Sequence, residues 1–246
     1  MPVNERTKRA LLGLSGNLCA FPDCNTRLVQ IQSSEDPYSI VGEVCHIKGD
    51  KPGSARYDAS VTEAERHSID NLILLCSTHH KLVDDQPKEY SVQKLQEFKR
   101  SHKAWAMKVL SREIAEVTFS ELDVTTKYLI ASTTTDSEIR VVAPREKIRK
   151  NELSGEVENL ITMGLARSKL VQDFLNRNPD PEFGERLKEG FVDEYNRLVE
   201  QEGLKGDILF ISLLDFASHN SSEVKLRAAG LTVLSYFFET CDVFET

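Results

Sequence analysis

Hydrophobic positions follow two different periods along this chain, and the change of period divides it into two parts. In the first part, short apolar or β-branched runs at 26–31, 38–47 and 71–76 predict strands. Between the last two runs lies a polar stretch, 48–68, with two glycines and a proline. This composition predicts a long loop, and long loops inside small domains are usually functional or disordered.

Three helices complete the first part. They are expected at 4–12, from Ser77 onward and at 91–111, where Ser91 is a plausible N-cap. The third has an apolar stripe at helical spacing, formed by Val92, Leu95, Phe98, Trp105 and Val109.

The second part has helical periodicity almost throughout. Its helices are expected at 146–164, 166–177, 182–202, 206–218 and 222–239, with breaks at prolines and a glycine. We therefore expect an α+β chain with three regions: a mixed domain at 1–112, a connecting segment at 113–143, and a mainly α-helical domain at 144–246.

Composition excludes several classes of protein. The hydrophobic share is 40% and the charged share 28% of 246 residues, which excludes a fully disordered or fibrous chain. No apolar run approaches the roughly 18–20 residues that a membrane span needs. The N-terminal residues lack the apolar core of a signal peptide. A cytoplasmic protein without a membrane partner is the resulting expectation.

The net charge of −8 is unevenly distributed. Residues 1–110 carry 15 Lys and Arg against 14 Asp and Glu, a net charge of +1. The remainder carries 16 against 25, a net charge of −9. A polyanion such as nucleic acid should therefore meet the first part, and the acidic helical part should face proteins.

Four of the five cysteines lie in the first 76 residues. Cys19 and Cys24 form one short pair, and Cys76 and His79 form a second pair about fifty residues later. Two such pairs on tight turns are the usual donor set of a tetrahedral zinc site. The alternative is that Cys19 and Cys24 are simply small buried residues.

Three further polar residues accompany these pairs. His46 ends the second predicted strand, Asn71 opens the third, and His80 directly follows His79. A single histidine is more often a satisfied core or surface residue. The order His, Asn, His beside two zinc half-sites is hard to explain by packing alone.

The segments LCAFPDC, EVCHI and DNLILLCSTHHKLVD resemble the HNH endonuclease family, whose core is a zinc-stabilised ββα-metal finger. The resemblance covers roughly residues 5–105. It implies a metal-dependent enzyme that hydrolyses DNA phosphodiester bonds. His46 would act as general base, His80 would ligate a catalytic Mg²⁺ or Mn²⁺, and Asn71 would orient the His46 region or brace the loop.

Zinc would then be structural, because Cys19, Cys24, Cys76 and His79 leave no open position. Some family members have an aspartate ligand directly before the catalytic histidine, where this chain has Cys45. Glu43 lies two residues earlier on the strand and is a candidate partner outside the ligand sphere. Basic residues near this core are expected to contact DNA phosphates: Arg6, Lys8, Arg9, Lys48, Lys51, Arg56 and Lys81.

The helical part, with PREKIRKNELSGEVENLITMGL and the closing YFFETCDVFE, resembles the C-terminal module of effectors in ABC-three-component bacterial conflict systems. This resemblance implies an anti-phage nuclease gated by protein partners, one of them an ABC-type ATPase subunit. A self-association bundle that forms a homodimer is an alternative use of the same helices.

Two other hypotheses remain open. The finger could bind nucleic acid without cutting it, which Cys45 in the metal-ligand position motivates. It could also be a zinc knuckle in an adaptor, although an adaptor needs none of His46, Asn71 and His80. Cleavage that is lost in His46→Ala while DNA affinity remains would separate the first alternative from a nuclease.

Overall fold

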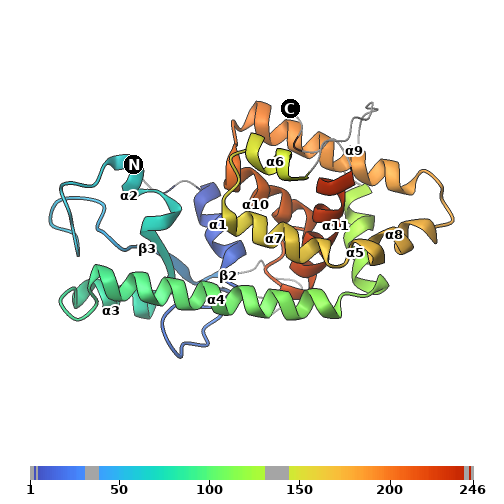
Figure 1. Ribbon diagram of the computed structural model, residues 1–246. Helices are drawn as coiled ribbons and strands as arrows, with labels where there is room; N and C mark the ends of the chain where they lie inside the picture. The colour runs from blue at the N-terminus through green and yellow to red at the C-terminus, as the bar shows by residue number, and fades with distance from the viewer. Residues whose placement is uncertain (1–2, 4, 31–38, 131–143, 241–243, 245–246) are drawn as a thin grey trace. The chain divides into compact units, whose positions relative to one another are not determined.

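Two antiparallel strands and the helix after them form the centre of the first part of the chain (Figure 1). The computed structural model describes residues 3, 5–30, 39–130, 144–240 and 244. Strand β3 (Gly42–His46) pairs with β4 (Leu72–Cys76), with Gly42 opposite Cys76 and His46 opposite Leu72. Helix α3 (Ser77–Asp85) starts directly after β4 and packs on both strands. The predicted ββα finger is therefore present, and Cys76 occupies the N-cap position of α3.

All five residues of β4 are buried, which explains its continuous apolar sequence. The surrounding core contains Leu28, Cys45, Val83 and Leu95. Gly42 is required at its position, because a Cβ there would lie 2.9 Å from Cβ of Leu28.

A helix and two short strands precede the finger. Helix α1 (Glu5–Leu14) leads to β1 (Val29–Gln30), which pairs with β2 (Ser39–Ile40). The predicted strand 38–47 is therefore interrupted at Val41, and its two pieces pair with different partners. The amides of Val41 and Gly42 both donate to the carbonyl of Leu28 at this break.

The connection between β3 and β4 is an ordered loop with two short helices. Helix α2 (Glu63–Arg66) begins with a capping box between Thr62 and Glu65, and η1 (Ile69–Asn71) is a 3-10 turn. The buried guanidinium of Arg66 donates to the carbonyls of Gly49, Asp58 and Val61. These bonds fold the polar stretch back on itself, so this loop is neither disordered nor extended.

Helix α4 (Val92–Glu116) continues five residues beyond the predicted end, and Ser91 Oγ accepts from the Lys94 amide at its start. The chain divides into two compact units, Met1–Lys108 and Val109–Thr246. The second unit thus includes α5 (Phe119–Ile130), which lies within the segment expected to be a connection. Its buried face, which contains Leu122 and Leu129, packs on helices of that unit.

The described part of the second unit contains a bundle of helices around α11 (Val224–Thr240), which has eleven buried residues. The other helices are α6 (Pro144–Lys150), α7 (Gly155–Leu165), α8 (Ser168–Asn176), α9 (Phe183–Asn196), which continues as the π-helical turn η2 (Arg197–Gln201), and α10 (Gly206–Ala217). The expected helix 146–164 is two helices, because Glu152 has a left-handed backbone (φ 51°) and Ser154 caps α7.

The expected fold class is confirmed: a small α+β finger with flanking helices, followed by a mainly helical part. No helix in the described residues is long and apolar enough to cross a membrane. Residues 131–143 of the expected connecting segment and the fifth cysteine, Cys241, lie outside the described residues.

Candidate metal centre and active site

The first cysteine pair lies on a tight turn. The Cys24 amide donates to the Phe21 carbonyl, Pro22 stands second in this turn, and Asp23 takes a left-handed conformation (φ 60°). This is the usual arrangement of a turn with proline second and an Asp, Asn or Gly third. The turn is joined to the finger where the amide of Cys76 donates to Cys19 Sγ at 3.2 Å.

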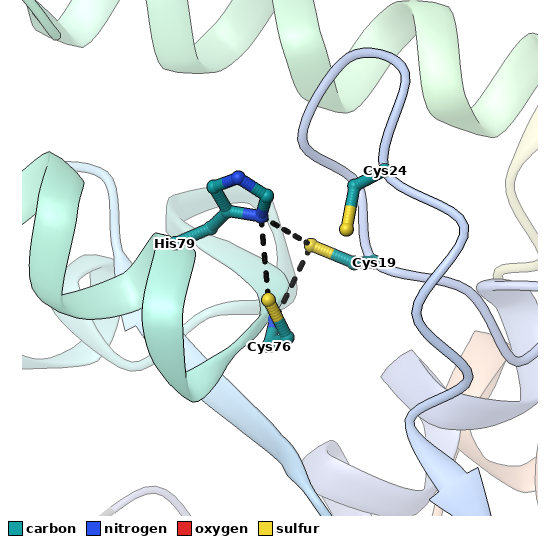
Figure 2. A group of neighbouring side chains, drawn as sticks. All are labelled: Cys19, Cys24, Cys76 and His79. Carbon is teal, nitrogen blue, oxygen red and sulfur yellow. Dashed lines mark hydrogen bonds between the residues drawn. The ribbon is translucent and has the colours of Figure 1, made fainter.

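The second pair comes from the start of α3. Cys76 immediately precedes the helix and His79 lies one turn along it, so both side chains reach the same side. Figure 2 shows the four side chains around one point, with the two halves facing each other. Their ligand atoms all lie within 4.8 Å of one another.

The dimensions of this cluster fit a tetrahedral zinc ion. His79 Nδ1 lies 3.3 Å from Cys76 Sγ and 3.7 Å from Cys19 Sγ. A tetrahedron with Zn–S of about 2.3 Å and Zn–N of about 2.0 Å has edges of about 3.5–3.8 Å. The His79 ring is fixed by stacking on Phe21, with ring centroids 3.9 Å apart and planes 1° apart.

The electrostatics of the cluster also favour a cation. Burial raises the pKa of the Cys19 thiol to about 12, so a nearby positive charge is needed to keep this thiolate. Burial lowers the pKa of His79, which keeps the imidazole neutral and able to ligate. This three-sulfur, one-nitrogen set can hold a zinc ion with no position left for substrate.

A second group of polar side chains lies at the other end of β3. His46 is the last residue of the strand, and its Nε2 lies 3.4 Å from Nδ1 of His67 in the loop. Burial lowers the pKa of His46 below its ordinary value, so the ring is neutral near pH 7. A neutral, half-buried imidazole can accept a proton from water.

Asn71 braces the loop rather than presenting its amide to solvent. Its Oδ1 accepts from the Lys48 amide, and its Nδ2 donates to the carbonyls of Lys48 and Arg66. The backbone of Lys48 lies two residues beyond His46. Asn71 therefore holds the segment that follows His46 in a fixed position relative to β4.

His80 lies between two carboxylates. Its Nδ1 is 2.5 Å from Glu43 Oε2, and its Nε2 is 3.4 Å from Asp84 Oδ2, one helical turn away. Hydrogen bonds to Asp84, Cys45 and Glu43 raise the pKa of His80 to about 11. This position is strongly attractive to a positive charge, whether a proton or a metal ion.

Cys45, His80 and Asp84 form a second group whose ligand atoms lie within 4.8 Å of one another. From the sequence, Cys45 stood out only as the residue in place of an aspartate ligand, and Asp84 was not singled out. The signal for Asp84 was present in the sequence, because it is four residues from His80 and therefore on the same helix face. His67 and the loop-forming Arg66 gave no such signal, because their partners come from the fold of the loop.

The expected DNA-contacting residues have different environments. The side chains of Arg6 and Arg9 lie outside the described residues, and Lys8 belongs to the described part of α1. Lys51 is exposed, Lys48 pairs with Asp58 at 2.9 Å, and Lys81, at 77% side-chain exposure, pairs with Asp85 at 2.7 Å.

Arg56 requires a correction. Its side chain is only 3% exposed, and its guanidinium donates to the carbonyls of His46, Ile47 and Val83 and to the Asp84 carboxylate. A side chain with these partners stabilises the loop and has no free face for a DNA phosphate. It is therefore a structural residue, because its planar fork matches several carbonyls at once.

Comparison with known proteins adds one finding. Residues 19–86 match the family model HNH_2, described as HNH endonuclease. The matched segment contains both cysteine pairs as well as His46, Asn71 and His80. No curated protein matches the chain.

Proposed function

We propose that this chain, with its HNH endonuclease domain at residues 19–86, is a metal-dependent enzyme that hydrolyses DNA phosphodiester bonds. One observation carries the proposal. The proposal is supported by the neutral His46 at the end of β3 and the carboxylate-flanked His80 on α3, the helix that packs on β3. Arg56 Nη2 donates to the His46 carbonyl and to the Asp84 carboxylate, and the other oxygen of this carboxylate lies 3.4 Å from His80 Nε2.

The proposed reaction uses His46 as the general base. His46 takes a proton from a water molecule as the water oxygen attacks the phosphorus, and the bond to the leaving sugar oxygen breaks. His67, at 3.4 Å from Nε2 of His46, leaves Nδ1 as the nitrogen available to water. A general base of this kind contributes about 10²- to 10⁴-fold to rate.

The developing negative charge requires a cation on the other side of the phosphate. A divalent ion held by His80 would stabilise the charge on the phosphate and the leaving oxygen. Asn71, which is not a base, keeps the backbone after His46 at a fixed distance from β4. The structural zinc set holds the start of α3, and with it His80, in place.

Binding of DNA is proposed for the basic residues around this site. Lys51 and Lys81 are exposed candidates, and Lys8 and Lys48 lie in the same unit, as do Arg6 and Arg9. Contacts of this kind bind the phosphate backbone without reading sequence.

Control of the enzyme is proposed for the second unit. This unit is acidic and helical, and no candidate metal group occurs in the part of it that the structure describes. Its resemblance to modules of bacterial anti-phage systems supports docking to partner proteins, such as an ABC-type ATPase subunit, and a homodimer is the alternative. A nuclease with little sequence specificity would also cut the genome of its own cell, so its activity needs to be restrained by partner proteins.

The test compares cleavage and binding in the same preparation. Supercoiled plasmid is incubated with the zinc-loaded wild type and His46→Ala in Mg²⁺, Mn²⁺ or Co²⁺, and DNA affinity is measured by fluorescence anisotropy. Cleavage that is lost in His46→Ala with unchanged affinity supports the nuclease. Equal binding with no cleavage by the wild type, also after addition of proteins encoded beside it, supports the non-cleaving alternative.

A further inference from the structure

The ligand atoms around His80 are of three chemical kinds, and one of them is a thiol. Cys45 Sγ lies 3.8 Å from Asp84 Oδ1, and His80 Nε2 lies 3.4 Å from Asp84 Oδ2. These separations are close to the edges of about 3–4 Å between ligand atoms that share one transition-metal ion. The three residues come from β3 and from successive turns of α3, so the fold itself assembles the set.

The orientation of His80 leaves one ring nitrogen for an ion. Nδ1 is occupied by Glu43 at 2.5 Å, and Nε2 points to the side where Cys45 and Asp84 meet. A carboxylate on the far nitrogen is the usual partner of a metal-bound histidine, because it fixes the ring and increases its basicity. Glu43 therefore acts as an orienting residue, and Nε2 is the donor atom.

The two carboxylate oxygens of Asp84 also have different partners. Its Oδ1 accepts from Arg56 Nη2, while Oδ2 faces His80. The carboxylate is thus held by one oxygen and can ligate through the other. Its side chain is 42% exposed, whereas Cys45 is fully buried, so the group is closed on the thiol side and open on the carboxylate side.

The charges around the group balance a divalent ion. Glu43, Asp84 and a Cys45 thiolate supply three negative charges, Arg56 supplies one positive charge, and a ligating His80 is neutral. The sum is two negative charges. Three protein donors also leave coordination positions for water and a phosphate oxygen, unlike the four-donor zinc set.

We propose that Cys45 Sγ, His80 Nε2 and Asp84 Oδ2 hold the catalytic ion, and that the thiolate makes this site select a borderline transition-metal ion such as Co²⁺ or Zn²⁺ over Mg²⁺. Thiolate and imidazole donors favour borderline and soft ions, whereas Mg²⁺ prefers oxygen donors in octahedral geometry and retains its waters. The catalytic role of this ion rests on the proposed function. Binding of the ion to the three residues does not, since it is measured without DNA.

The test uses the full chain with one equivalent of zinc in the four-donor set. A further equivalent of Co²⁺ is added, and the near-ultraviolet spectrum is recorded against the zinc-loaded protein. The wild type should show a sulfur-to-cobalt charge-transfer band, and Cys45→Ser should lose the band and bind Co²⁺ at least about tenfold more weakly. Cys45→Asp should also lose the band and bind Mg²⁺ more tightly than the wild type does.

Two variants on α3 supply the matched comparison. Asp84→Asn should weaken Co²⁺ binding while the band remains, because the thiolate is still present. Asp85→Asn changes the neighbouring exposed carboxylate, which pairs with Lys81, and should leave affinity and spectrum unchanged. These variants keep the inference testable even if the buried Cys45 does not tolerate serine.

Three results would overturn the inference. They are a cobalt complex of the wild type without the band, unchanged Co²⁺ affinity in both Cys45→Ser and Asp84→Asn, or displacement of Co²⁺ by an equal concentration of Mg²⁺. Plasmid cleavage, measured in parallel, separates failure of this ion-site inference from failure of the proposed nuclease activity. A band without cleavage supports the site alone, and equal cleavage by wild type and Cys45→Ser in Mg²⁺ supports the nuclease alone.

Discussion

At the residue scale, the loop between β3 and β4 depends on side chains that bind backbone carbonyls. Arg56 and Arg66 together reach the carbonyl of His46 at the end of β3, carbonyls of the loop and the carbonyl of Val83 in α3. Asn71 adds three more hydrogen bonds. Arg56 has a left-handed backbone (φ 55°), which the loop stabilises through these contacts. The position of His46 relative to His80 is therefore set by residues that do not themselves react.

Arg56→Lys should destabilise the first unit although the charge is kept. A lysine ammonium is a point donor and cannot reproduce a fork that serves four carbonyls and Asp84 at once. We expect a loss of about 2–4 kcal/mol in the free energy of unfolding, from several buried hydrogen bonds. Urea denaturation of the zinc-loaded protein measures it, and Lys81→Arg on the exposed face of α3 is the neutral control. Unchanged stability of Arg56→Lys would refute the structural role of Arg56.

Asn71→Ala tests the second anchor. Loss of three hydrogen bonds should cost about 2 kcal/mol of unfolding free energy. Asn71→Asp keeps the acceptor for the Lys48 amide but loses both donations, so its stability should not exceed that of the wild type. Hydrogen exchange at the backbone amide of Lys48 should become faster in Asn71→Ala. An unchanged exchange rate would show that the Asn71 side chain does not hold this segment.

At the element scale, the four-donor cluster joins a turn to a helix, and a zinc ion is the proposed link between them. The Cys19–Cys24 turn contacts β4 and α3 through only a few hydrogen bonds in the described residues, so we expect a bound ion to supply much of the connection. Structural zinc in finger peptides contributes apparent binding energies of about 10–16 kcal/mol.

Removal of zinc by a chelator should therefore unfold part of the first unit and leave the second unit folded. We expect fast hydrogen exchange in β3, β4 and α3, with α7, α10 and α11 still protected, because their core contains no zinc donor among the described residues. Cys76→Ala should give the same pattern without a chelator. Protection of α3 that survives complete zinc removal would contradict a structural metal.

The sequence predicted the elements better than it predicted the loop and the ion site. Strand 71–76 and the helices were readable because periodicity and continuous apolar runs are local signals. The break at Val41 arises because the two strand pieces pair with different partners, and the break at Glu152 arises because this residue has a left-handed backbone. Neither cause is visible in the hydropathy pattern. Arg56 looked like a surface cation because its partners are carbonyls distant in sequence.

At the scale of the whole molecule, charge is divided between the two units. The first 110 residues are nearly neutral and the remainder carries most of the negative charge, so DNA affinity should come from a small number of lysines and arginines. The docking of partner proteins that we propose for the acidic unit agrees with this division of charge.

Lys51→Ala and Lys81→Ala should each weaken DNA binding at all sequences and reduce the dependence of log affinity on log salt by about one unit. Anisotropy titrations between low and physiological salt measure both slopes. Lys225→Ala, in the second unit, is the control and should leave the slope unchanged. An unchanged slope in both first-unit variants would place the DNA-binding surface elsewhere.

The most direct test of the account is the single-turnover rate of plasmid cleavage by the zinc-loaded chain with its preferred ion, for wild type, His46→Ala and the control His219→Ala. We expect a decrease of about 10²- to 10⁴-fold for His46→Ala, because the general base is lost, and an unchanged rate for His219→Ala. A wild-type cleavage rate that His46→Ala retains in full would contradict the proposed active site.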